Sequence, residues 1–136
     1  MVRLIMGVKG SGKTKQLIEL INNAAKDEPG NVVCIEADNN MTYDIHYHIR
    51  LIDAEEYKLD SYDTFRGFIS GLYAGNYDIS HVFIDNLCKT VGGEVGRNTE
   101  GFLNWLDKFG EKNGIKFTVT ISAAIDAATD GMQRYL

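Results

Sequence analysis

Apolar residues along this chain gather in short blocks that alternate with longer segments of helical periodicity. The blocks are typical of parallel strands, because a strand that is covered on both faces is apolar at nearly every position. Such strands are predicted at residues 3–6, 31–37, 50–53, 81–85 and 115–122. Apolar side chains at helical spacing predict helices from within residues 7–14 to about 26, at about 61–74 and at about 99–112.

This alternation predicts an α/β fold with three layers and a mainly parallel, five-stranded sheet. The 136 residues suffice for one domain with a sizeable core, so the whole of 1–136 is expected to form a single domain. In such sheets, ligands bind beyond the carboxyl ends of the strands. Side chains that follow the strands are therefore the first candidates for a functional site.

Residues that break or cap helices separate these elements. Pro29–Gly30 ends the first helix, Asp60 or Ser61 caps the second, and Asn113–Gly114 stops the third. Segment 41–49 fits either a short helix or irregular structure, and the last residues fit a short helix.

Composition narrows the classes of function. Charged residues make up 24% and the net charge is −5, which argues against a broad nucleic-acid-binding surface. No apolar run approaches the length of about 20 residues that a membrane span needs. The first strand begins at once, so we expect no signal peptide. Cys34 and Cys88 form no metal-binding or redox motif, and we interpret them as reduced thiols of a cytoplasmic protein.

The strongest motif is GVKGSGKT at residues 7–14, which fits the Walker A pattern G-x-x-x-x-G-K-T of a phosphate-binding loop. It follows an apolar strand and precedes a helix, which is the context the motif requires. Its backbone N–H groups and the helix N-terminus can hold phosphate, Lys13 can reach the β- and γ-phosphates, and the Thr14 hydroxyl can ligate Mg²⁺. The residues expected to bind phosphate are Gly7, Lys9, Gly10, Ser11, Gly12, Lys13 and Thr14.

A second motif is the apolar strand 82–85, which ends in Asp85 and fits the Walker B pattern. An aspartate here holds Mg²⁺ beside Thr14, directly or through water. Asn86 stands where many ATPases have a catalytic glutamate, and an amide cannot accept a proton from water. The activating carboxylate would then lie elsewhere, and Glu36 and Asp38 at the end of an earlier strand are both candidates.

These features together resemble the RecA-like P-loop NTPases, over about residues 2–123. The matching stretches are residues 7–14, 32–38 (VVCIEAD), 81–87 (HVFIDNL) and 116–122 (KFTVTIS). The resemblance implies binding of ATP with Mg²⁺ and hydrolysis coupled to motion in an oligomer. It also implies a catalytic carboxylate at Glu36 or Asp38 and a γ-phosphate-sensing residue at Ser122 or Thr120.

The chain also resembles small bacterial P-loop proteins described as twitching-motility, or pilus-retraction, ATPases. True retraction motors carry an additional N-terminal domain and histidine- and aspartate-rich boxes. The segment YDIHYH at residues 43–48 does not form such a box, and no preceding domain is expected. The resemblance therefore implies the ATP-binding core and not the motor function.

Two polar segments leave alternatives open. Residues 87–98 are rich in glycine and fit a surface loop, although Lys89 or Arg97 within them could contact a γ-phosphate. The aromatic and histidine residues of 43–48 could stack on a nucleoside, but half-buried packing is the simpler interpretation. Trp105 is interpreted as core.

Three functions fit the sequence. The leading hypothesis is a Mg²⁺-dependent ATPase, and the sequence leaves open whether it works alone, with a protein partner or as a homo-oligomer. The second is a nucleoside or small-molecule kinase, because thymidine kinases have a similar opening sequence, although Asn86 departs from their glutamate. The third is a module that binds nucleotide without hydrolysis and docks a partner.

Overall fold

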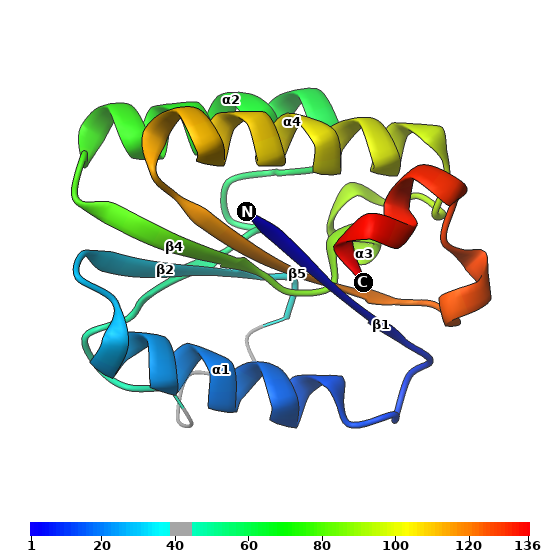
Figure 1. Ribbon diagram of the computed structural model, residues 1–136, viewed down its shortest axis with the longest axis horizontal. Helices are drawn as coiled ribbons and strands as arrows, with labels where there is room; N and C mark the ends of the chain where they lie inside the picture. Colours follow the sequence, from blue (N-terminus) through cyan, green and yellow to red (C-terminus); the bar gives the residue numbers. More distant parts are fainter. Residues whose placement is uncertain (39–44) are drawn as a thin grey trace.

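A five-stranded, all-parallel sheet forms the centre of the molecule and helices cover both of its faces (Figure 1). The structure is a computed structural model that describes residues 1–38 and 45–136. The strands are β1 (Val2–Gly7), β2 (Asn31–Glu36), β3 (Arg50–Asp53), β4 (Ile79–Ile84) and β5 (Lys116–Ser122). The α-helices are α1 (Lys13–Asp27), α2 (Tyr62–Gly75), α3 (Leu87–Val91) and α4 (Arg97–Asn113). Two 3₁₀ helices follow, η1 (Ile125–Ala127) and η2 (Asp130–Tyr135).

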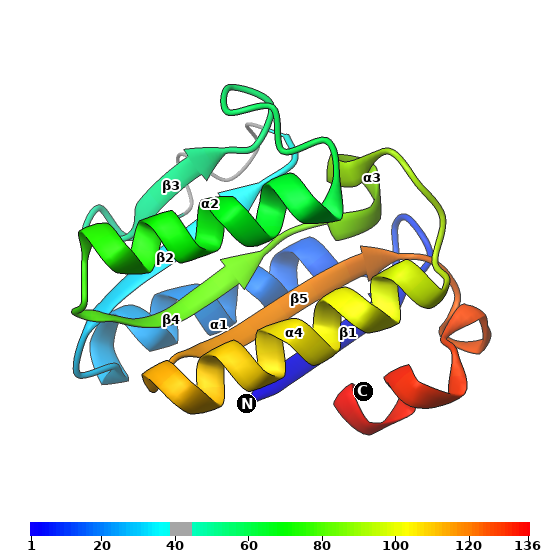
Figure 2. The same ribbon diagram turned by 90° about the horizontal axis from the view of Figure 1, so that it is seen from above.

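The order of the strands is β1-β5-β4-β2-β3, with α1 on one face and α2 and α4 on the other (Figure 2). The predicted α/β class and the mainly parallel sheet are thereby confirmed. Each predicted strand and helix is present to within about two residues at either end. The Ser61 cap is confirmed as well, because its hydroxyl oxygen accepts the Thr64 N–H at 3.1 Å.

The prediction of a loop at residues 87–98 was wrong at its start, where α3 forms. Five residues are too few to display a helical period, so the pattern could not reveal this helix. The residue before this helix and the residue after it have left-handed backbone conformations, with φ of 51° at Asn86 and 74° at Gly92. Of segment 41–49, residues up to 44 lie outside the described part, and 45–49 are neither helix nor strand.

The sheet separates two apolar cores. On the side of α2 and α4, the core contains the fully buried rings of Phe65, Phe102 and Phe117. On the side of α1, it contains Leu17 and Ile21 of the helix and Phe83 of β4. Trp105 is only half-buried at the edge of the first core. Both cysteines are free thiols, as expected.

Gly110 lies where α4 packs against the start of β5. A Cβ atom at this position would overlap the Ile115 carbonyl oxygen and come within 3.2 Å of the Phe117 ring. Because neither neighbour can move without disturbing the core, we expect Gly110→Ala to lower the free energy of unfolding by about 1–3 kcal/mol. Chemical denaturation of the purified variant measures this change.

Gly67 in α2 is the matched control, because it is also a helical glycine but has open space around it. Gly67→Ala is expected to raise the free energy of unfolding by up to about 1 kcal/mol, since alanine favours the helix. Equal effects of the two substitutions would contradict the proposed clash.

A partly buried polar cluster lies at the end of the sheet opposite the phosphate loop. The His81 Nε2 atom lies 2.9 Å from the Thr118 hydroxyl, and Nδ1 lies 3.5 Å from Glu28, which also pairs with Lys116 at 2.9 Å. Burial lowers the pKa of His81 to about 4, although the Glu28 charge partly opposes this. His81 is therefore neutral at physiological pH.

Candidate functional site

The phosphate loop joins β1 to α1 at the carboxyl end of the sheet, at the same end of the molecule as α3 (Figure 1). Two of its glycines adopt left-handed backbone conformations, with φ of 87° at Gly10 and 88° at Gly12. Gly12 is the residue that caps α1, and it offers no side chain to the first-turn N–H groups. These donors and the positive end of the helix are available to an anion.

The loop is closely wound on itself. The Ser11 N–H donates to the Val8 carbonyl oxygen at 3.1 Å, and the Lys13 ammonium donates to the same oxygen at 3.1 Å. A Cβ atom on Gly7 would overlap the Ser11 hydroxyl, so a larger residue there would force the Ser11 side chain to rotate. Lys13 is thereby held over the loop, where it can meet phosphate oxygens.

Three polar residues lie in one row across the central strands, at the end of β2, just after β4 and within β5. β4 pairs with β2 on one side and β5 on the other, and the register puts Asp85 between Glu36 and Thr120. The Thr120 hydroxyl donates to Asp85 Oδ1 at 2.9 Å and accepts the Asn86 N–H at 2.8 Å. Burial raises the pKa of Asp85, although the bond from Thr120 partly opposes this. The Walker B carboxylate is thus fixed in position by a neighbouring strand.

A hollow of about 710 Å³ lies over the phosphate loop and the ends of the strands. Its lining combines residues from four separate segments of the chain. They are Lys9, Gly10, Gly12, Lys13, Thr14, Asp38, Asp85, Asn86, Lys89 and Ser122. The hollow therefore brings together the loop of the first motif with the carboxylate of the second.

Most of the predicted site residues line this hollow, but Gly7, Ser11, Glu36 and Thr120 do not. Gly7 and Ser11 belong to the loop but not to this lining, and Glu36 is buried, with only 1% of its surface exposed. Asp38 does line the hollow. Of the two residues considered for phosphate sensing, Ser122 lines it and Thr120 contacts Asp85.

The site offers oxygen ligands that suit Mg²⁺. Within residues 1–38 and 45–136, no three His, Cys, Asp or Glu side chains meet to hold a metal ion. Mg²⁺ in nucleotide sites is usually held by one or two protein oxygens, with phosphate and water completing its shell. The Thr14 hydroxyl and the Asp85 carboxylate, both in this hollow, fit that role.

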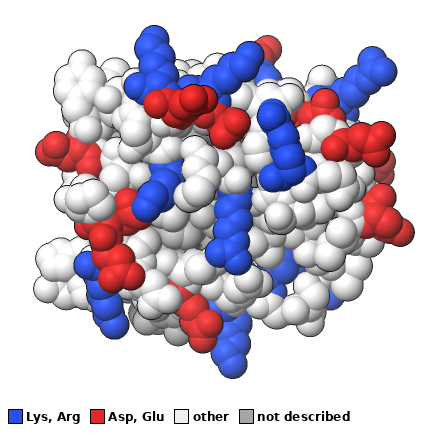
Figure 3. Space-filling view, in the orientation of Figure 1, with Lys and Arg blue, Asp and Glu red and all other residues white. Residues whose placement is uncertain are grey.

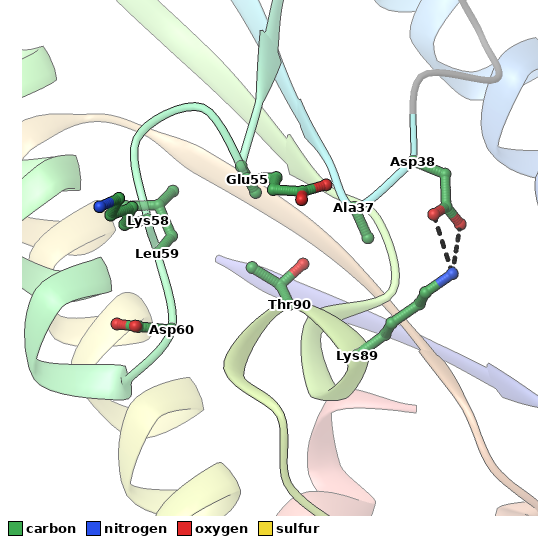
Figure 4. A pocket seen from close by; sticks show the side chains of 9 residues that line it. Ala37, Asp38, Glu55, Lys58, Leu59, Asp60, Lys89 and Thr90 are labelled. Carbon is green, nitrogen blue, oxygen red and sulfur yellow. Dashed lines mark hydrogen bonds and ion pairs between the residues drawn. The ribbon is translucent and has the colours of Figure 1, made fainter.

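Lys89 and Asp38 form an ion pair at the edge of the hollow. The Lys89 ammonium contacts both Asp38 oxygens at 2.8 Å (Figure 4). Lys89 thus reaches the site, whereas Arg97 begins α4 and does not line it. The two partners are 51 residues apart, and nothing in the local sequence pattern indicates that they meet.

A second hollow of about 310 Å³ shares the Asp38–Lys89 ion pair with the first, and Figure 4 shows its lining. It has an apolar wall with carboxylate, ammonium and hydroxyl groups around it. The lining residues are Ala37, Asp38, Ala54, Glu55, Lys58, Leu59, Asp60, Lys89 and Thr90. Sequence analysis did not predict this hollow, because β3 and its following loop carry no recognisable motif.

Of the histidine and tyrosine segment, the described side chains of His46, Tyr47 and His48 line neither hollow. His46, Tyr47 and His48 are exposed and stack on one another, and the His46 N–H donates to Asn22 of α1. The expectation of half-buried packing was therefore wrong for these three residues. They leave the core because Ile45 and Ile49 on either side take the buried positions. Tyr43 lies outside the described residues.

Acidic and basic side chains are interspersed on the face shown in Figure 3, and neither sign gathers into a broad patch there. Among the helices that the structure describes, none combines the length and the apolar character needed to cross a membrane. No protein-family model matches the sequence, and no curated protein matches it significantly.

Proposed function

We propose that this protein is a RecA-like P-loop NTPase that binds ATP with Mg²⁺ and hydrolyses it. The observation that carries the proposal is the hollow in which Lys13 and Thr14 of the phosphate loop meet Asp85 and Asp38. These residues come from three separate segments, so their meeting is not a property of one motif. A glycine-rich turn without a ligand would not require the two carboxylates.

Each part of the hollow has a role in this proposal. The loop N–H groups and Lys13 bind the phosphates and stabilise the charge that develops during transfer. Thr14 and Asp85 would hold Mg²⁺, which would supply positive charge to neutralise the phosphates. Thr120 keeps the Asp85 carboxylate in place through its hydrogen bond.

Asp38 is the better of the two candidates for the base, because it lines the hollow whereas Glu36 is buried outside its lining. A water oxygen attacks the γ-phosphorus and forms the new P–O bond, while its proton passes to the Asp38 carboxylate. The bond from the γ-phosphorus to the β–γ bridging oxygen breaks. ADP leaves with that electron pair.

The second hollow favours one alternative, a small-molecule kinase. It adjoins the first beyond Asp38, so an acceptor hydroxyl there could replace water. Formation of ADP without an equal amount of free phosphate would distinguish this transfer from hydrolysis.

Nucleotide binding and phosphate release with Mg²⁺-ATP test the proposal. We expect Lys13→Ala to reduce turnover by at least about a hundredfold, because it removes a cation from the transferring phosphate. Release of inorganic phosphate and isothermal titration with ATP measure the two properties separately.

Lys15→Ala is the matched control, because Lys15 is an exposed lysine of the same helix that does not line the hollow. It should retain turnover. Tight binding by the wild type without any turnover would favour the docking module instead. Absence of binding would overturn the proposal.

A further inference from the structure

The Asp38–Lys89 ion pair separates the two hollows. Asp38 and Lys89 are the two residues common to both linings. Figure 4 shows the Lys89 side chain reaching from α3 to Asp38, with Glu55 and Thr90 on the side of the second hollow. The carboxylate that we propose as the base is therefore engaged by an ammonium group.

This pair can be broken easily by a stronger anion. The side chains of Lys89 and Asp38 are 57% and 40% exposed, and exposed ion pairs contribute little free energy. A bound triphosphate carries several negative charges, whereas Asp38 carries one. Lys89 lines the same hollow as Lys13 and Thr14, so its ammonium shares a space with the phosphates.

The position of Lys89 is tied to the Walker B strand. It is the third residue of α3, which begins two residues after Asp85. The left-handed conformation of Asn86 turns the chain directly into this helix. The four-carbon stem of lysine then allows the ammonium to change partner without movement of the helix.

We propose that Lys89 exchanges Asp38 for the terminal phosphate of a bound triphosphate. This inference rests on the proposed nucleotide-binding function and assigns a role to a residue outside both motifs. The exchange makes affinity depend on the third phosphate and frees Asp38 to accept a proton. A diphosphate lacks the terminal group, so Lys89 stays on Asp38 and the carboxylate stays engaged.

Binding measurements test the exchange without relying on turnover. The probes are Mg²⁺-ADP and a Mg²⁺-bound ATP analogue with nitrogen in place of the β–γ bridging oxygen. We expect Lys89→Met to weaken binding of the analogue about tenfold and of ADP less than about twofold, since a charged hydrogen bond to phosphate is lost. Lys108→Met, at an exposed position of α4, makes the same change of charge and should alter neither affinity.

Asp38→Asn gives the opposite expectation. It removes the competing carboxylate, so the analogue should bind a few-fold more tightly while ADP affinity stays unchanged. In the double variant with Lys89→Met this gain should disappear, because Asp38 then has no lysine to compete for. Equal losses for ADP and the analogue in Lys89→Met, or no loss, would overturn the exchange and leave the proposed function standing. A wild type that binds neither nucleotide would overturn both.

Discussion

Asp85→Asn is expected to reduce Mg²⁺-dependent turnover by at least about a hundredfold while making the protein more stable at neutral pH. Turnover falls because an amide is a poor substitute for a carboxylate that holds Mg²⁺. The fold should persist, because the asparagine carbonyl can still accept the hydrogen bond from Thr120. Phosphate release and the thermal midpoint, measured without Mg²⁺, are the two readouts.

The gain in stability follows from the sign of the shift in pKa. Burial raises the pKa of Asp85 above its ordinary value of 3.8, so the folded protein holds its proton to higher pH than the unfolded chain. As pH rises from 3.8 through the raised pKa, the charged carboxylate therefore lowers the free energy of unfolding. Asparagine removes this cost at neutral pH.

Asp126→Asn at an exposed position is the control and should change neither turnover nor the thermal midpoint. If Asp85→Asn retained full turnover with Mg²⁺, Asp85 would not be a metal ligand. If Asp85→Asn lowered the thermal midpoint, the inference that the buried Asp85 charge destabilises the fold would be wrong.

Acid is expected to destabilise the protein by roughly 3 kcal/mol between pH 6.5 and pH 4, through His81 alone. Its pKa falls from the ordinary 6.5 to about 4 in the fold. The unfolded chain therefore binds the proton first as pH drops, and the free energy of unfolding falls across this window. Denaturant titrations at a series of pH values measure the slope.

His81→Gln separates this effect from that of the neighbouring carboxylate. Glutamine can still bond to Thr118 but does not titrate. Burial raises the pKa of Glu28, but hydrogen bonds from Lys116 and Ser80 and the nearby charges outweigh it, so the net shift is downward. Its contribution is then lost only below pH 4.5. Asp85 contributes equally to wild type and variant, so the difference between their slopes from pH 6.5 to 5 isolates His81. An unchanged slope in the variant would assign the acid sensitivity to other groups.

The fold could largely be predicted because its determinants are local. A continuous apolar run such as Val32–Ile35, or the stripe that includes Leu17 and Ile21, specifies an element without knowledge of its neighbours. The phosphate loop is equally local, because its glycines and Lys13 are adjacent in sequence. The local sequence pattern did not reveal α3, because this helix is shorter than two helical turns.

The rest of the candidate site depends on the order of the strands, which local pattern does not contain. The Asp38–Lys89 pair and the contact of Thr120 with Asp85 exist because β4 lies between β2 and β5. Likewise, the burial of Glu36 depends on β3 pairing beside it. Sequence analysis could name these residues as candidates, but it could not decide which of them meet.

The position of β1 has a consequence for synthesis of the protein. β1 is an edge strand that pairs with β5, so within this sheet the strand that is translated first pairs with the one translated last. Contacts so distant in sequence form late, because the loop between them must close first. On the ribosome, β1 stays without this partner until residues 116–122 have emerged. Under the proposed function, nucleotide affinity of a nascent chain would therefore report that translation has passed β5.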